Sequence, residues 1–137
     1  MNAWTKPTAV LTLVTALTGA AGLAAAAGPF DGSKPFLCSV TTVMECDAAG
    51  HCERHLPDAA NTPQFIRVDL AAQAISADGN KKSQLKSVAH VDSELILQGS
   101  ENARGWSVTI DEPTGRMAAA VVENDYAFSL FGTCTIP

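Results

Sequence analysis

The last third of the chain alternates between apolar and polar residues, which restricts these segments to β-strands. In residues 106–111, Trp106, Val108 and Ile110 share one face of an extended chain, while Ser, Thr and Asp residues occupy the other. Residues 126–135 alternate in the same way. A half-buried antiparallel sheet is the structure that this period of two predicts.

Further segments carry strand patterns separated by turn residues. Short connections between most of them favour a meander over a Greek-key sandwich. The sequence therefore predicts a single small all-β domain: an antiparallel meander of eight or nine strands, formed as an up-and-down barrel or curled sheet. A turn near residues 57–61 is the one segment with helical character. The additional strands are expected at residues 36–46, 52–56, 66–70, 85–91, 94–99 and 116–122.

Residues 1–27 are typical of a cleaved secretory signal peptide. Lys6 supplies a positive charge, residues 9–17 are apolar, and Ala25 and Ala27 fit the two small subsites of a signal peptidase. The segment is too diluted by Thr, Gly and Ala to be retained as a span of about 20 strongly apolar residues. We expect a mature β-domain of residues 28–137, periplasmic or secreted, without a stable membrane anchor.

The charge balance argues against a nucleic-acid partner. The chain has 14 Asp and Glu residues against 9 Lys and Arg residues, and loss of Lys6 leaves eight basic residues and a net charge of −6. Binding to phosphates requires clustered basic residues that displace counterions. The one basic cluster, Lys81, Lys82 and Lys86, is too short for that purpose.

Four cysteines allow three disulfide pairings. Cys46 and Cys52 flank a turn-forming stretch that brings them opposite one another across a hairpin. Cys38 and Cys134 lie near the start of the first long strand and the end of the last one, which become neighbours if the meander closes. We favour Cys46–Cys52 with Cys38–Cys134. The next choice is Cys38–Cys52 with Cys46–Cys134.

The same loop offers an alternative chemistry. Cys46, His51, Cys52 and His55 would supply two thiolates and two imidazoles to zinc or copper, giving a function in metal or redox handling. Their spacing matches no strong zinc signature, and cysteines of exported proteins are usually oxidised. The structural disulfide is therefore the favoured interpretation, and we expect no cofactor.

No catalytic motif emerges from the sequence. It lacks the zinc-protease, nucleophile-elbow, P-loop and dinucleotide-binding signatures. Ser83 and Lys86 match S-x-x-K, but in a strand these positions point to opposite faces. Asp69 and Asp111 each end a strand and are expected to stabilise turns. The sequence favours a protein that is not an enzyme, with no catalytic residue.

Two other side chains and one loop carry specific structural expectations. His90 is expected to face outward with Lys86, leaving Leu85 on the inner side of the same strand. Trp106 is expected to anchor the core, with a ligand-binding position at the barrel mouth as the alternative. The loop at residues 56–63 is long for this fold and is a candidate contact for a partner.

A pattern of residues extends along the β-domain, at Cys38, 65–69, 105–107, Ile110, Asp111, 114–117 and 131–134. This pattern resembles that of small exported bacterial β-proteins that carry no assigned activity. The likeness spans most of residues 36–135. In architecture alone the chain is similar to the small periplasmic barrels that inhibit c-type lysozymes, but it lacks a clear Ser-Gly loop motif with a nearby aromatic residue.

These observations lead to one functional expectation. An export signal, a disulfide-stapled β scaffold and the lack of a catalytic set favour a non-enzymatic binding or inhibitor-like module of the cell envelope, acting on a protein or a small ligand.

Overall fold

The computed structural model describes residues 28–78 and 81–137. The expected signal peptide, residues 1–27, lies outside the described residues. The strands are β1 (Phe36–Asp47), β2 (Cys52–His55), β3 (Phe65–Asp69), β4 (Ala74–Ala77), β5 (Lys81–Val91), β6 (Glu94–Glu101), β7 (Arg104–Asp111), β8 (Arg116–Glu123) and β9 (Tyr126–Thr135), and the 3₁₀ helix η1 spans Pro57–Ala60.

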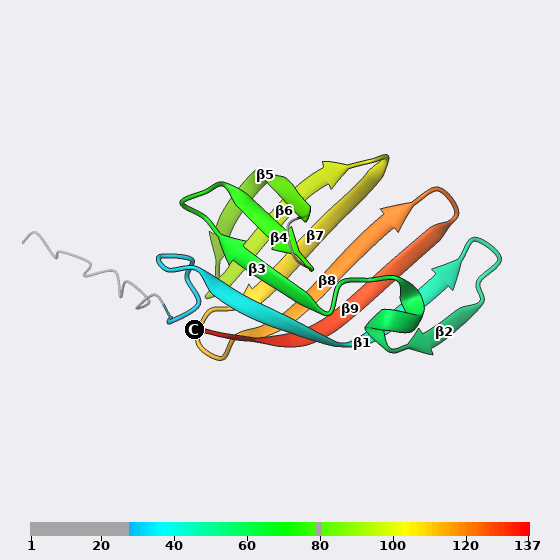
Figure 1. Ribbon diagram of the computed structural model, residues 1–137, viewed down its shortest axis with the longest axis horizontal. Coiled ribbons are helices and arrows are strands. Elements are labelled where there is room, and N and C mark those ends of the chain that lie inside the picture. The colour runs from blue at the N-terminus through cyan, green and yellow to red at the C-terminus, as the bar shows by residue number, and fades with distance from the viewer. Residues whose placement is uncertain (1–27, 79–80) are drawn as a thin grey trace, which may run out of the picture.

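The strands form a closed antiparallel barrel, which confirms the predicted fold class. From β3 to β9 each strand pairs with the next, and β9 returns to pair with β1 over ten residue pairs. The other edge of β1 is shared, because β3 pairs with its first half and β2 with its second half. Eight strands thus close the barrel, and β2 extends from it as the second strand of a hairpin (Figure 1).

Turn chemistry explains why the chain reverses so sharply between strands. Asp92 and Ser93 between β5 and β6 both have positive φ, as do Asn102 and Ala103 between β6 and β7. Two successive residues of this kind are typical of type I′ turns, whose twist matches that of the flanking strands. These two-residue turns fix the register of β5, β6 and β7.

Side chains fill the interior of the barrel. The apolar residues expected from the alternation, among them Val108 and Ile110, point inward and are buried, at 3% and 0% exposure. The buried apolar cluster contains one residue or more from each of β1 and β3 to β9. The largest fully buried side chains are Phe36, Leu95, Leu97, Ile110 and Leu130.

Residues 28–35 close one end of the barrel. The backbone N–H of Phe30 donates to the carbonyl of Glu112 at 3.1 Å, and the Phe30 ring meets the Phe36 ring edge to face with centroids 5.7 Å apart. The C-terminus lies at the same end of the molecule (Figure 1). None of the helices in residues 28–78 and 81–137 is long and apolar enough to cross a membrane.

One strand departs from its predicted alternation. A β-bulge between Leu85 and Ser87 shifts the register of β5 against β6, so that Val88 and His90 lie opposite the buried Leu97 and Leu95. A bulge inserts one extra residue and exchanges the two faces beyond it. His90 therefore lies on the inner face of β5, and not on the outer face as predicted, but its side chain is near the closed end and stays 52% exposed.

Candidate binding surface

The structure contains both disulfides that the sequence favoured. Cys38 and Cys134, opposite one another on β1 and β9, are bonded in the core across 96 residues of sequence. Cys46 and Cys52 are bonded across the β1–β2 hairpin. One disulfide thus ties together the first and last strands of the barrel, and the other staples the projecting hairpin. Both are compatible with an oxidising, extracellular environment.

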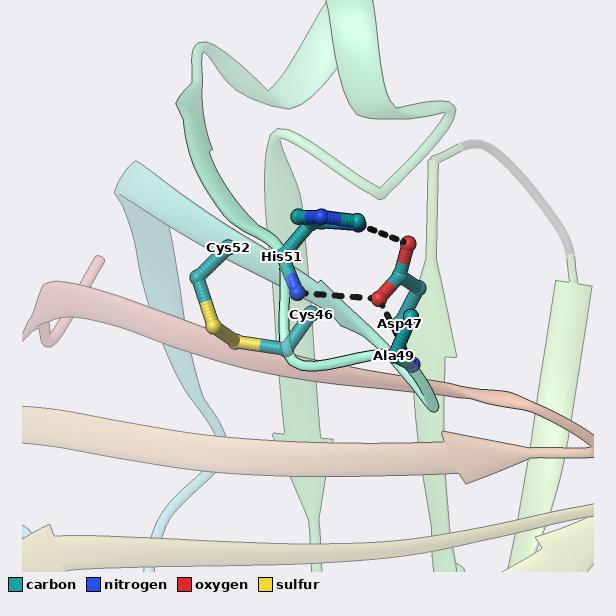
Figure 2. A network of polar contacts seen from close by, with 5 residues as sticks. All are labelled: Cys46, Asp47, Ala49, His51 and Cys52. Carbon is teal, nitrogen blue, oxygen red and sulfur yellow. Dashed lines mark hydrogen bonds and ion pairs between the residues drawn. A yellow bond between two sulfur atoms is a disulfide. The ribbon is translucent and has the colours of Figure 1, made fainter.

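Asp47 organises the turn of that hairpin (Figure 2). Its Oδ1 accepts from the backbone N–H groups of His51 and Ala49, each at 2.9 Å, and its Oδ2 lies 3.2 Å from Nδ1 of His51. The hydrogen bond from the His51 backbone is the largest cause that holds the pKa of the Asp47 carboxyl below its usual value, followed by the His51 side chain and the Ala49 amide. Asp47 therefore acts as a turn cap.

The four residues considered as metal ligands are engaged elsewhere in this structure. The sulfurs of Cys46 and Cys52 are bonded to each other, and His51 faces Asp47. His55 lies 3.8 Å from Glu45 and 3.7 Å from Glu53, measured from Nε2 to a carboxylate oxygen. Across residues 28–78 and 81–137, no group of three or more His, Cys, Asp or Glu side chains is arranged to hold a metal ion.

The two strand-ending aspartates also cap turns, as expected. Asp69 Oδ1 accepts from the Ala72 backbone N–H at 3.0 Å. Asp111 Oδ2 accepts from the backbone N–H of Thr114 at 3.1 Å and from its hydroxyl. Both carboxylates thus accept hydrogen bonds from the turns that directly follow them in the chain.

Trp106 lies on the inner side of β7. Its indole Nε1–H donates to the hydroxyl of Ser83 at 3.1 Å, and its ring packs over Gly99, where an added Cβ would lie 2.2 Å from Cζ2. The ring is partly buried against the core. Trp106 is therefore a core anchor, and its hydrogen bond satisfies the hydroxyl of the buried Ser83. Lys86, the other residue of the S-x-x-K match, is exposed.

His90 and Glu112 form a polar contact that sequence reasoning missed. Glu112 is 5% exposed, and its Oε1 lies 2.6 Å from Nδ1 of His90. Asp31 of the closing segment lies near this pair, and its pKa is lowered first by hydrogen bonds from Ser33 and to a smaller extent by His90. The bulge that turns His90 inward has no clear signature in the sequence.

The outer face of β7, β8 and β9 is almost free of charge. The outward positions run across paired strands, so that Thr109, Ala118 and Phe131 form one row, and Ser107, Ala120 and Ser129 form the next. Charged residues on this face, Asp111 and Arg116, lie only at the closed end. In a chain with 14 acidic and 9 basic residues, such a neutral area differs from the ordinary solvated surface.

Phe131 stands in a shallow hollow of this face. Its side chain is 46% exposed, and the hollow has a volume of about 490 Å³. The small side chain of Ala118 leaves space beside the ring, and Thr41 donates its hydroxyl proton to the Phe131 carbonyl at 3.2 Å. The remaining lining residues are Glu94, Thr109, Asp111, Arg116, Met117, Gly132 and Thr133. We call the outward face around this hollow the Phe131 face.

A second hollow lies over β3 and β4. Its volume is about 620 Å³, and Phe65, 48% exposed, lies at its edge. Asp78 accepts the backbone N–H groups of Gln64 and Phe65, each at 3.2 Å. Arg67, Asp69 and Lys82 also line this hollow, which with Asp78 has four charged lining residues against three in the hollow around Phe131. The loop at residues 56–63, which forms η1, carries Leu56 at 70% exposure.

Comparison with protein-family models, curated proteins and solved structures gives no match for this chain.

Proposed function

We propose that this chain is an exported, non-enzymatic binding module that receives its partner on the Phe131 face, in the periplasm or outside the cell. The observation that carries the proposal is the exposed Phe131 ring on a sheet face whose charged residues, Asp111 and Arg116, lie only toward the closed end. Binding interfaces have cores that are depleted of charge and enriched in aromatic residues. Export rests on the signal-like residues 1–27 and is supported by the two disulfides.

The shape of the face favours a protein partner over a small ligand. A small molecule binds in a cavity that buries most of its surface. Here the buried apolar cluster fills the barrel, and the hollow beside Phe131 is open and shallow. A flat face of this kind suits a partner that covers the ring from above, with Arg116, Asp111 and Glu94 at the rim to set its orientation.

Quantitative capture from a cell-envelope extract tests the proposal. The mature chain is compared with Phe131→Ser and with Tyr126→Ser, a matched control because both aromatic side chains are 46% exposed. We expect at least one extract protein to be captured roughly tenfold less by Phe131→Ser and equally by Tyr126→Ser. Equal capture by all three proteins would place the binding site elsewhere.

A separate assay addresses the absence of catalysis. The purified chain is incubated with a panel of hydrolase substrates, and we expect no turnover. Turnover that disappears when a clustered set of polar residues is mutated would refute the non-enzymatic part of the proposal.

A further inference from the structure

Half of β5 has an open edge. Residues 81–84 pair with β4, and the backbone N–H of Leu85 donates to the carbonyl of Gln73 at 2.9 Å. Beyond that point β4 has ended, and residues 87–91 pair only with β6. No other backbone hydrogen bond reaches residues 87–91 from the described parts of the chain. This segment therefore presents unpaired N–H and C=O groups at the side of the barrel.

The open edge lacks the usual protection against pairing. Soluble proteins guard such edges with charges, prolines or bulges within the strand. The sequence Ser-Val-Ala-His-Val at residues 87–91 contains neither proline nor a Lys, Arg, Asp or Glu, and the bulge precedes it. Val88 and Val91 are 37% and 50% exposed. Both the backbone and the side chains of this segment are thus suited to receive another strand.

The charges that flank the edge are arranged symmetrically. Lys86 precedes the segment and Asp92 follows it, each three residues from Ala89, and both are exposed. When the segment pairs antiparallel with a copy of itself about Ala89, Lys86 of one copy comes level with Asp92 of the other. The same two-fold axis generates this opposite-charge pair twice. Any register shifted along the strand separates the two charges.

We propose that a second copy of this chain adds to the edge at residues 87–91, forming a two-fold dimer in which β5 of one protomer continues the sheet of its partner. The symmetric charges favour a second copy over an unrelated extended peptide. The mature net charge of −6 opposes self-association over most of the surface. The β5 edge escapes this repulsion, because it has no charge of its own and is flanked by one cation and one anion.

The two-fold axis also fits the side chains that meet there. Ala89 faces its own counterpart across the axis, and its small side chain permits close approach of the strands. Val88 of one copy lies opposite His90 of the other, so that their exposed surfaces cover each other. The dimer leaves the Phe131 face free, because that face lies on β7, β8 and β9. This inference is independent of the proposed function.

Sedimentation equilibrium of the mature chain tests the dimer, with the same substitution placed at two sites. Ala89→Lys sets two like charges opposite each other at the axis, and we expect the dimer dissociation constant to rise roughly tenfold or more. Ala120→Lys, on the outer face of the fully paired β8, is the matched control and should leave the constant unchanged. A monomeric wild-type chain at roughly 0.1 mM overturns the proposal. A dimer that is dissociated by Ala120→Lys and not by Ala89→Lys also overturns the proposal.

A charge exchange tests the register. Lys86→Asp faces Asp92 of the other copy with a like charge and should weaken the dimer, whereas the double variant Lys86→Asp/Asp92→Lys should recover it. Because Asp92 has a φ of 49°, thermal unfolding of each variant is followed to verify that the hairpin is intact. Amide exchange supplies a second readout, in which protection at residues 87–91 should rise with protein concentration. A folded double variant as weak as Lys86→Asp, or unchanged exchange at residues 87–91, contradicts this arrangement.

Discussion

The Nδ1 atom of His90 lies 2.6 Å from Oε1 of Glu112, the one Asp, Glu, Lys or Arg side chain that is buried in residues 28–78 and 81–137. The Glu112 backbone also joins two other parts of the fold: its carbonyl accepts from the Phe30 N–H of the closing segment, and its N–H donates to the Ser93 carbonyl in the turn between β5 and β6. This contact couples the end of β5, the loop after β7 and the segment at residues 28–35.

Removing His90 should destabilise the barrel. His90→Ala leaves the buried Glu112 carboxylate without its side-chain donor, and the free energy of unfolding should fall by about 1–3 kcal/mol. Glu112→Gln keeps the shape of the side chain and removes the charge, so the double variant should lose less than the sum of the single variants. Urea unfolding measures the free energy of unfolding of the two single variants and of the double variant. If the losses of unfolding free energy in the two single variants simply add in the double variant, the His90 and Glu112 side chains do not interact.

The two disulfides should contribute unequally to stability. The Cys38–Cys134 bond closes a loop with a sequence separation of 96, against 6 for Cys46–Cys52. Chain-entropy estimates give about 4–5 kcal/mol for the long loop and about 2–3 kcal/mol for the short one. Urea unfolding of the variants Cys38→Ala/Cys134→Ala and Cys46→Ala/Cys52→Ala compares them. A larger loss from the hairpin pair would contradict the view that Cys38–Cys134 is the principal staple.

Two glycines in different strands, Gly132 in β9 and Gly105 in β7, should respond differently to alanine. A Cβ on Gly132 would lie 1.9 Å from the Ser39 carbonyl oxygen, which is backbone, whereas a Cβ on Gly105 has 3.7 Å to a Val122 methyl group. Gly132→Ala should therefore cost about 1–3 kcal/mol or more, and Gly105→Ala should change stability by less than about 1 kcal/mol. Thermal unfolding provides the comparison. Equal midpoints would mean that β1 and β9 approach less closely at Gly132.

Asp47 should make the stability of the hairpin depend on acid pH. Its pKa is lowered in the folded chain, first by the His51 backbone N–H, from an ordinary value of 3.8. The unfolded state therefore takes up the proton first as pH falls. The stabilisation is complete above the ordinary value and is lost as pH drops through the folded pKa.

A carboxyl NMR titration measures this effect. The Asp47 resonance should titrate below the range of an unfolded aspartate. Asp47→Asn retains an oxygen acceptor for the turn and should remove this part of the pH dependence while leaving the hairpin folded. An unshifted Asp47 resonance would show that the amide hydrogen bonds do not persist in solution.

The sequence predicted much of the barrel because its strands obey a simple rule. Trp106, Val108 and Ile110 alternate without interruption, and the pairing of Cys38 with Cys134 followed from a meander whose ends meet. His90 was misplaced because a single extra residue in β5 reverses the alternation beyond it. Nothing in the local pattern around Lys86 marks that residue as the extra one.

The candidate surface was harder to find in the sequence. Phe131 alternates with Leu130 and Gly132 in β9, and its neighbours on the outer face, Ala118 and Thr109, come from other strands. The neutral area appears only when the register of three strands is known. The folding of residues 28–35 over the barrel end was missed for the same reason, because Phe30 hydrogen bonds to Glu112 and its ring lies beside Gly115, both distant in sequence.

Photo-crosslinking in a bacterial host that exports the chain through its own leader tests the central claim most directly. A photoreactive phenylalanine analogue is placed at Phe131, and in parallel at Tyr126 and at Phe65, which have comparable exposure. The account predicts a defined adduct with one partner protein from position 131 and none from position 126. An adduct from position 65 alone would move the site to the charged hollow over β3 and β4, and equal labelling at all three positions would contradict a specific Phe131 face.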